Sequence, residues 1–104
     1  MPKKIKIACV CGAGVGSSLL VKMAIEKVLK KNGFQLNNLQ IDCADLQSGR
    51  GLAMFSDIVI STYAFQASLA DVTVDKILVH NIFDENELEE KLIPVYQNVL
   101  EKKK

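Results

Sequence analysis

The sequence predicts an α/β fold built on a small, open, four-stranded parallel sheet. Four apolar runs of strand length alternate along the chain with helical or turn-forming segments. Two of these runs are almost continuously apolar, which is typical of parallel strands that are buried on both faces. The segments between the runs are long enough for the right-handed crossovers that parallel strands need. We therefore expect helices on both faces of the sheet, in three layers.

Composition limits the class of protein. The chain has 104 residues, of which 49% are hydrophobic, so a single domain over residues 1–104 is expected. Its 13 basic and 12 acidic side chains create no field that would attract nucleic acid. No apolar run approaches the roughly 20 residues of a membrane span, and three cysteines suit reduced thiols better than a disulfide framework. These features favour a cytoplasmic protein.

The first strand is expected over residues 5–11, IKIACVC, and an amphipathic helix follows it. Ser17 or Ser18 is expected to cap the start of this helix, which should end near Gly33. Its apolar face, which we expect to contribute to the core, comprises Leu20, Val21, Ala24, Ile25, Val28 and Leu29.

Three further strands are expected over residues 39–43, 57–62 and 76–80. The first alternates apolar and polar residues, which favours an edge position, whereas the other two are nearly continuous apolar runs. The segments that separate these three strands each have room for a loop and a short helix. Right-handed crossovers then give the strand order 2-1-3-4, a Rossmann-like arrangement.

The last helix is expected to start at Asp84, with Glu87 at capping-box spacing. Pro94 lies inside the helical pattern, so we expect a kink or break near residues 90–94. The apolar positions that should be buried are Leu88, Leu92, Val95 and Val99.

The loop after the first strand, CGAGVGSS, is the predicted functional site. Ligands of open parallel sheets bind beyond the carboxyl ends of the strands, near the point where the strand order reverses. Glycines at every second position let successive backbone N–H groups converge on one anion, and the helix start adds its positive end. The predicted phosphate loop comprises Gly12, Ala13, Gly14, Val15, Gly16, Ser17 and Ser18.

Cys11 opens this loop, where the same N–H groups and the helix dipole favour thiolate over thiol. A thiolate inside a phosphate cradle predicts phosphoryl transfer through a phosphocysteine. Cys9, inside the strand, and Cys43, at the end of the second strand, are interpreted as packing residues.

Other phosphate and metal motifs fit less well. The loop has no lysine where a Walker A motif requires one, and a dinucleotide fingerprint would need glycine in place of Ser17. Zinc binding by Cys9, Cys11 and His80 lacks both the usual spacing and enough ligands. We therefore expect neither a metal nor a cofactor.

A low-molecular-weight cysteine phosphatase, or a related arsenate reductase, is the main alternative. In those enzymes a similar loop ends in an arginine that clamps the phosphate, whereas this chain has Ser17 there and its one arginine is Arg50. Stabilisation by backbone dipoles and hydroxyls alone suits passing the group on better than hydrolysing it. A regulatory or interaction module, in which the cysteine signals to a partner, remains a further alternative.

The stretch KIKIACVCGAGVGSSLLVKM, residues 4–23, resembles the opening of the IIB components of the bacterial phosphoenolpyruvate-dependent sugar phosphotransferase system. Within that group the loop is most similar to the ascorbate-type branch. The order of strands and helices extends the resemblance over nearly the whole chain.

The resemblance implies a phosphoryl relay. A phosphohistidine on a IIA protein would phosphorylate Cys11, which would hand the group to a sugar, of ascorbate type, during uptake by a membrane IIC transporter. The protein would then dock peripherally on that transporter. Candidates for the apolar part of the docking face are Ala13, Val15, Leu19 and Leu20. Leu20 itself is expected in the core, and Arg50 and His80 are interpreted as surface residues.

Overall fold

The computed structural model describes residues 4–10, 15–34, 36–37, 39–44, 51–81 and 84–102, with residues 15–19 described by their backbone. Its centre is a four-stranded sheet in the order β2-β1-β3-β4, with all neighbours parallel. The strands are β1 (Ile5–Val10), β2 (Leu39–Ala44), β3 (Ile58–Thr62) and β4 (Asp75–Val79). The predicted fold class and strand order are therefore confirmed.

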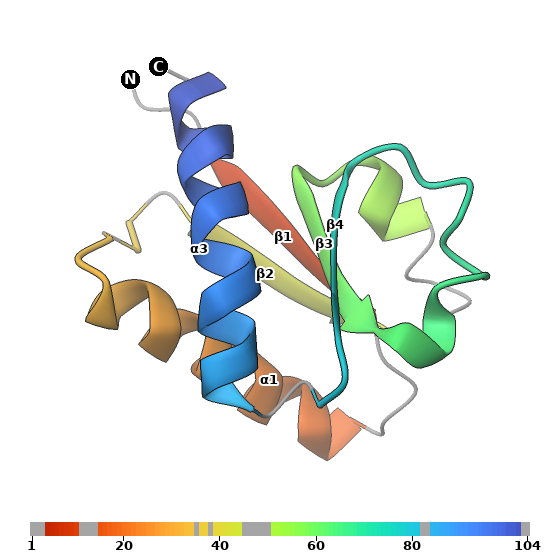
Figure 1. Cartoon of the computed structure of the whole chain (residues 1–104), viewed down its shortest axis with the longest axis horizontal. Helices are drawn as coiled ribbons and strands as arrows, with labels where there is room; N and C mark the ends of the chain where they lie inside the picture. The colour runs from red at the N-terminus through yellow and green to blue at the C-terminus, as the bar shows by residue number, and fades with distance from the viewer. Residues whose placement is uncertain are drawn as a thin grey trace.

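The two faces of the sheet are covered differently (Figure 1). Helices α1 (Val15–Lys31) and α3 (Glu85–Lys102) lie on one face. A helical segment at residues 51–54 and the 3-10 helix η1 (Tyr63–Phe65) lead the chain over the other face. The larger core cluster lies between the sheet and the two long helices, and the smaller one includes Ala8, Val10 and Leu69.

Strand position follows the hydrophobic pattern. Residues 58–61 of β3, an inner strand, are fully buried, as a strand with cover on both faces requires. The alternating strand β2 lies at an edge, as predicted, and buries Ile41 while its neighbours are half-buried. β4 forms the opposite edge, so its nearly continuous apolar run does not indicate burial on both faces: only Ile77 and Val79 of this strand are buried.

Helix α1 ends as the sequence predicts, at a glycine in the left-handed conformation. Gly33 has a φ of 85° and donates its backbone N–H to the Lys30 carbonyl at 3.1 Å. The N–H of Phe34 bonds to the Leu29 carbonyl at 3.0 Å, which completes a Schellman motif. Phe34 then packs edge-on against Tyr96 of α3, with ring centroids 4.9 Å apart.

The start of α1 differs from the prediction. The helix begins at Val15, so Ser17 and Ser18 lie inside its first turns and neither is the N-cap. The first turn of any helix leaves N–H groups without partners within the helix, and it tolerates serine and glycine there. A serine pair after glycines therefore indicates a helix start without fixing the residue at which it begins.

Helix α3 has the predicted cap but only half of the predicted capping box. The Asp84 carboxylate accepts hydrogen bonds from the N–H groups of Asn86 and Glu87 at 3.1 and 3.3 Å. The N–H of Asp84 bonds to the Asn81 carbonyl, not to the Glu87 side chain. Glu87 instead reaches the backbone at the end of β4, a tertiary contact that competes with the local one.

Helix α3 continues through Pro94 without the break that the sequence suggested as one possibility. Proline removes one backbone hydrogen bond and crowds the preceding turn, a cost that packing on both sides can offset. Leu88 and Leu92 before it, and Tyr96 and Val99 after it, are buried. Tyr96 takes the buried place expected of Val95, which is half-buried.

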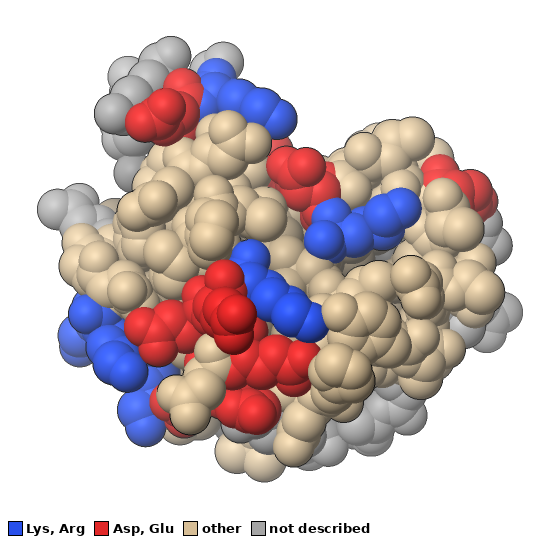
Figure 2. Space-filling model, viewed as in Figure 1, with Lys and Arg blue, Asp and Glu red and all other residues tan. Residues whose placement is uncertain are grey.

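Charges of both signs share the face shown in Figure 2. Acidic side chains gather over the first half of α3, where they complement the positive end of the helix. Lysines of α1 lie beside them, and Lys27 and Lys31 reach Glu85 and Glu89 at 3.5 and 3.4 Å. These pairs are solvent-exposed and link the two helices only weakly.

Candidate active site

The predicted loop connects the carboxyl end of β1 to the start of α1. β1 ends at Val10, on a strand that lies between β2 and β3 in the sheet, and α1 begins at Val15. Cys11, Gly12, Ala13 and Gly14 lie outside the described residues. The other predicted members, Val15, Gly16, Ser17 and Ser18, form the first turn of α1.

The start of α1 has the electrostatics of an anion site. The N–H groups of a first helical turn lack acceptors within the helix, and the dipoles of the following turns make this end positive. No acidic side chain occupies the first turn of α1, and the helix is 17 residues long. A phosphoryl group beside this end would therefore be favoured by charge as well as by hydrogen bonding.

Strand β3 holds the end of β1. Ser61 is fully buried, the one buried polar side chain among the described residues, and its hydroxyl donates a hydrogen bond to the Val10 carbonyl. Val10 is the last residue of β1, directly before Cys11. Sequence reasoning missed this contact, although a serine at the end of the apolar run DIVIST was a visible exception to its pattern.

A cluster of four polar side chains lies at the carboxyl ends of β3 and β4. Tyr63 follows β3, His80 follows β4, and Glu87 and Lys91 come from the first turns of α3. His80 Nδ1 lies 2.8 Å from the Glu87 carboxylate, and the centroids of the Tyr63 and His80 rings are 4.6 Å apart. His80 is thus an exposed edge residue with a carboxylate partner.

The Glu87 carboxylate has several donors. The backbone N–H of His80 lowers the pKa of Glu87 most, and the Asn81 N–H, the His80 ring and Lys91 add to it, so the pKa falls from 4.5 to about 2. Glu87 therefore stays ionised and ties α3 to the end of β4.

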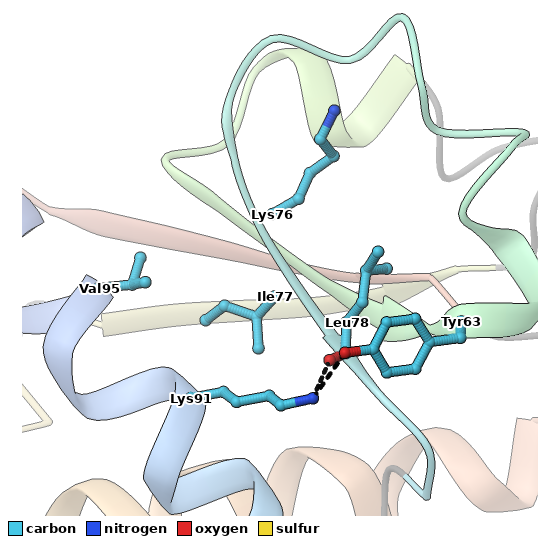
Figure 3. Close-up of a pocket in the computed structure, with 6 residues that line it drawn as sticks. All are labelled: Tyr63, Lys76, Ile77, Leu78, Lys91 and Val95. Atoms are coloured by element: carbon cyan, nitrogen blue, oxygen red, sulfur yellow. Dashed lines mark hydrogen bonds between the residues drawn. The ribbon is translucent and has the colours of Figure 1, made fainter.

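Lys91 ties α3 to both β3 and β4, as Figure 3 shows. Its ammonium donates to the Tyr63 hydroxyl at 2.8 Å and to the Leu78 carbonyl at 2.9 Å. The Tyr63 hydrogen bond foremost, and then the Glu87 carboxylate, raise the pKa of Lys91. The lysine forms one wall of an open pocket of about 350 Å³ along β4. Lys76, in the same pocket, donates to the Leu69 and Val72 carbonyls. Both ammonium groups are therefore engaged in hydrogen bonds that hold segments of the fold together.

Two apolar side chains near the start of α1 are exposed. Leu20 is 56% exposed and Met23 is 55% exposed, and they lie three positions apart on the helix. The expectation that Leu20 joins the core is wrong, because Val21, Ile25 and Val28 supply the face that turns to the sheet. Leu20 is instead exposed, together with Met23, and its predicted part in a docking face stays a prediction.

The two described cysteines lie on one face of the sheet. Cys9 is fully buried, as predicted, and Cys43 is half-buried against the same core cluster. Arg50 lies outside the described residues. Within the described ranges, no three His, Cys, Asp or Glu side chains are grouped so that they could hold a metal ion. The described helices also include none that is long and apolar enough to cross a membrane.

The sheet order and the position of the loop define a small parallel α/β protein with its candidate site at the carboxyl edge. The sequence model of the family described as "PTS system, Lactose/Cellobiose specific IIB subunit" matches residues 6–93. The chain therefore belongs to this family of IIB subunits of the sugar phosphotransferase system (PTS), which confirms the resemblance noted in the sequence. Members of the family act as sugar phosphotransferases, and this chain is a component of that kind.

Individual relatives agree with the family. The chain is 30% identical over 94 residues to the ascorbate-specific PTS EIIB component of Mycoplasma pneumoniae, covering 89% of this chain and 96% of that protein. The cellobiose-specific IIB component of Borrelia burgdorferi has a similar fold, with a TM-score of 0.61 at 21% identity, over 99% of this chain and 97% of that one.

The lactose-specific IIB domain of Streptococcus pneumoniae has the same fold, with a TM-score of 0.58 at 14% identity. The match covers 95% of this chain and 97% of that one. At these identities the two solved structures support the fold alone.

Proposed function

We propose that the protein is a single-domain phosphocarrier, spanning residues 1–104, in which the Cys11 thiolate accepts a phosphoryl group from a phosphohistidine on a IIA protein. Cys11 then passes the group to a sugar during uptake by a membrane IIC transporter. The observation that carries the proposal is the start of α1, which has no acidic side chain in its first turn and follows β1 after only four residues, the first of which is Cys11.

The chemistry needs two displacements at phosphorus. In the first, the Cys11 sulfur attacks, the N–P bond of the phosphohistidine breaks as the S–P bond forms, and the imidazole leaves with the electron pair. In the second, a sugar hydroxyl attacks, the S–P bond breaks, and the thiolate is restored as the hydroxyl proton passes to a base. The backbone N–H groups of the phosphate loop, Gly12 to Ser18, stabilise the transferring charge in both steps.

Both partners must reach the same sulfur, so they use one docking face. Leu20 and Met23 supply exposed apolar surface on α1, the helix that starts beside the loop. Burial of such side chains against a partner is favourable because it removes apolar area from water. The protein acts in the cytoplasm and docks peripherally on the transporter. The similarity to an ascorbate-specific EIIB component supports ascorbate or a related sugar acid as the substrate.

Intact mass tests the proposal. The protein is incubated with phosphoenolpyruvate, the general phosphotransferase proteins and a IIA partner, beside a Cys11→Ser variant. One phosphoryl group should be gained by the wild type alone and lost on adding ascorbate with membranes that hold the IIC transporter. If both proteins gain the group, or if the wild type hydrolyses an aryl phosphate instead, the carrier role is wrong and the phosphatase alternative gains support.

A further inference from the structure

Two of the three cysteines lie side by side on neighbouring strands. Cys9 of β1 and Cys43 of β2 are register partners in the parallel sheet. Register partners present their side chains on the same face, and both cysteines pack in the core cluster under α1 and α3. Their side chains are hydrogen-bonded to each other. Both are reduced thiols in this structure.

The spacing of the strands suits a disulfide at this position. Neighbouring strands lie about 4.7–4.9 Å apart. Disulfide-bonded cysteines usually have Cα atoms about 4.4–6.8 Å apart. The strand spacing therefore lies within the Cα range of a disulfide for the register pair Cys9 and Cys43.

The two thiols differ in access and in acidity. Cys9 is fully buried, whereas Cys43 is half-buried and sits at the carboxyl end of β2. The hydrogen bond from Cys9 lowers the pKa of Cys43 most, and Lys22 of α1 adds to this, while burial and Asp42 oppose it. Cys43 is thus the thiol that an oxidant reaches first. Cys9 is the neighbouring thiol that can then attack the oxidised Cys43 sulfur.

We propose that Cys43 and Cys9 form an oxidation-sensitive pair, in which a hydroperoxide oxidises Cys43 and Cys9 then closes a disulfide. The Cys43 thiolate attacks one peroxide oxygen, the O–O bond breaks, and the released alkoxide or hydroxide takes up a proton, which leaves a sulfenic acid. The Cys9 thiol gives up its proton and its sulfur attacks the Cys43 sulfur. The S–S bond forms, the S–O bond breaks, and water leaves.

The pair lies beside the proposed phosphoryl acceptor but does not include it. Cys9 is two residues before Cys11, so the bridge would tie β1 to β2 next to the loop. The proposal does not depend on phosphocarrier function, because each readout below is thiol chemistry. Failure of one proposal therefore leaves the other standing.

The test uses the full chain with Cys11→Ser, so that only Cys9 and Cys43 carry thiols. Brief alkylation of the reduced protein should label Cys43 and spare Cys9. In a separate, unalkylated sample, hydrogen peroxide should remove both alkylatable thiols and lower the intact mass by two hydrogens, and peptide mapping should find Cys9 joined to Cys43 in a monomer. A reductant should restore both thiols.

Two variants in the same background serve as controls. With Cys43→Ser, the buried Cys9 should resist the peroxide, and with Cys9→Ala, Cys43 should gain oxygen without forming a bridge in the monomer. Circular dichroism checks that each variant is folded. The proposal is overturned if Cys9 is alkylated before Cys43, if Cys43 gains oxygen while Cys9 stays a thiol, or if the disulfide joins two chains.

Discussion

At the scale of single residues, the contact that bears most directly on the site is the bond from Ser61 to the Val10 carbonyl. A fully buried hydroxyl is retained only where it finds a partner, because an unsatisfied polar group in the core is costly. Here the partner is the last carbonyl before Cys11. Because a peptide unit is planar, holding this carbonyl restricts how the chain enters the loop.

Replacement of Ser61 by alanine should affect both stability and phosphoryl transfer. Ser61→Ala removes one buried hydrogen bond and leaves the Val10 carbonyl without its hydroxyl donor, which should lower the free energy of unfolding by about 1–2 kcal/mol. If Ser61 also positions the loop, phosphorylation of Cys11 by IIA should slow. Urea denaturation and the rate of phosphoryl gain measure the two effects.

Ser56→Ala is the matched control for that variant. Ser56 donates to the Leu52 carbonyl at 2.8 Å, but it lies before β3, at the amino ends of the strands, whereas the loop follows a carboxyl end. Its loss should cost some stability and leave the transfer rate unchanged. Equal transfer rates in the two folded variants would limit Ser61 to a structural role.

At the scale of elements, helix α1 carries both the candidate anion site and the exposed apolar pair Leu20 and Met23. The sequence predicted its existence, its inward face and its glycine end, because periodicity and left-handed glycine are local properties. Its first residue and the exposure of Leu20 were not predicted. Both depend on where the helix meets the sheet, which local periodicity does not report.

The end of α1 gives a test of backbone conformation. Gly33→Ala should lower the free energy of unfolding by about 1–2 kcal/mol, because φ is 85° there and an L residue is strained in that region. A Cβ at Gly33 would meet no atom within 4 Å, so the cost is conformational and not steric. Denaturation midpoints in urea measure it.

Gly51→Ala is the comparison variant. Its Cβ would also meet no atom within 4 Å, and Gly51 has helical backbone without a positive φ. This variant should be neutral or slightly more stable, since alanine restricts the unfolded chain. Equal losses at both positions would count against the Schellman motif as the feature that ends α1.

The apolar pair on α1 tests the docking face. Leu20→Asp or Met23→Asp should slow phosphoryl transfer from IIA, because each places a charge in a surface that must lose water on docking. Met54→Asp is the control, since Met54 is 67% exposed but precedes β3, at the amino ends of the strands and away from the loop. If all three variants slow transfer alike, the docking face lies elsewhere or the changes act through stability.

At the scale of the whole molecule, the sheet order was predicted from the rule of right-handed crossovers together with the hydrophobic patterns of β2 and β3. β3, an inner strand, is apolar apart from Ser61 and Thr62, and the edge strand β2 alternates. The polar contacts could not be predicted in the same way. Ser61 and Val10, which are hydrogen-bonded, are 51 residues apart in the chain. The Glu87 carboxylate accepts a hydrogen bond from the backbone N–H of His80, directly after β4, rather than from the start of its own helix. Of the predicted loop, Cys11 to Gly14 fall outside the described residues and stay predictions.

The Glu87 contacts give a pH prediction for the folded molecule. Because folding lowers the pKa of Glu87 from 4.5 to about 2, its carboxylate stabilises the fold above pH 4.5, and this contribution is lost as the pH falls towards 2. Glu87→Gln should therefore be less stable than the wild type at neutral pH, and the difference should shrink through that range. Thermal melts at several pH values measure it.

Glu101→Gln is the control for the pH series. It removes an exposed carboxylate near the far end of α3, away from the β4 contacts. Its stability should follow that of the wild type at each pH. A Glu87→Gln deficit that stayed constant from pH 7 to 2 would contradict the assignment of a lowered pKa to this residue.

The central claim is that Cys11 carries the phosphoryl group, and locating that group on the chain tests it most directly. Tandem mass spectrometry of the protein phosphorylated by its IIA partner, digested under conditions that preserve both phosphocysteine and phosphohistidine, reads the modified residue. The account predicts a thiophosphate on Cys11 and an unmodified His80, the one histidine of the chain. A phosphoryl group on His80, or on a cysteine other than Cys11, would contradict it.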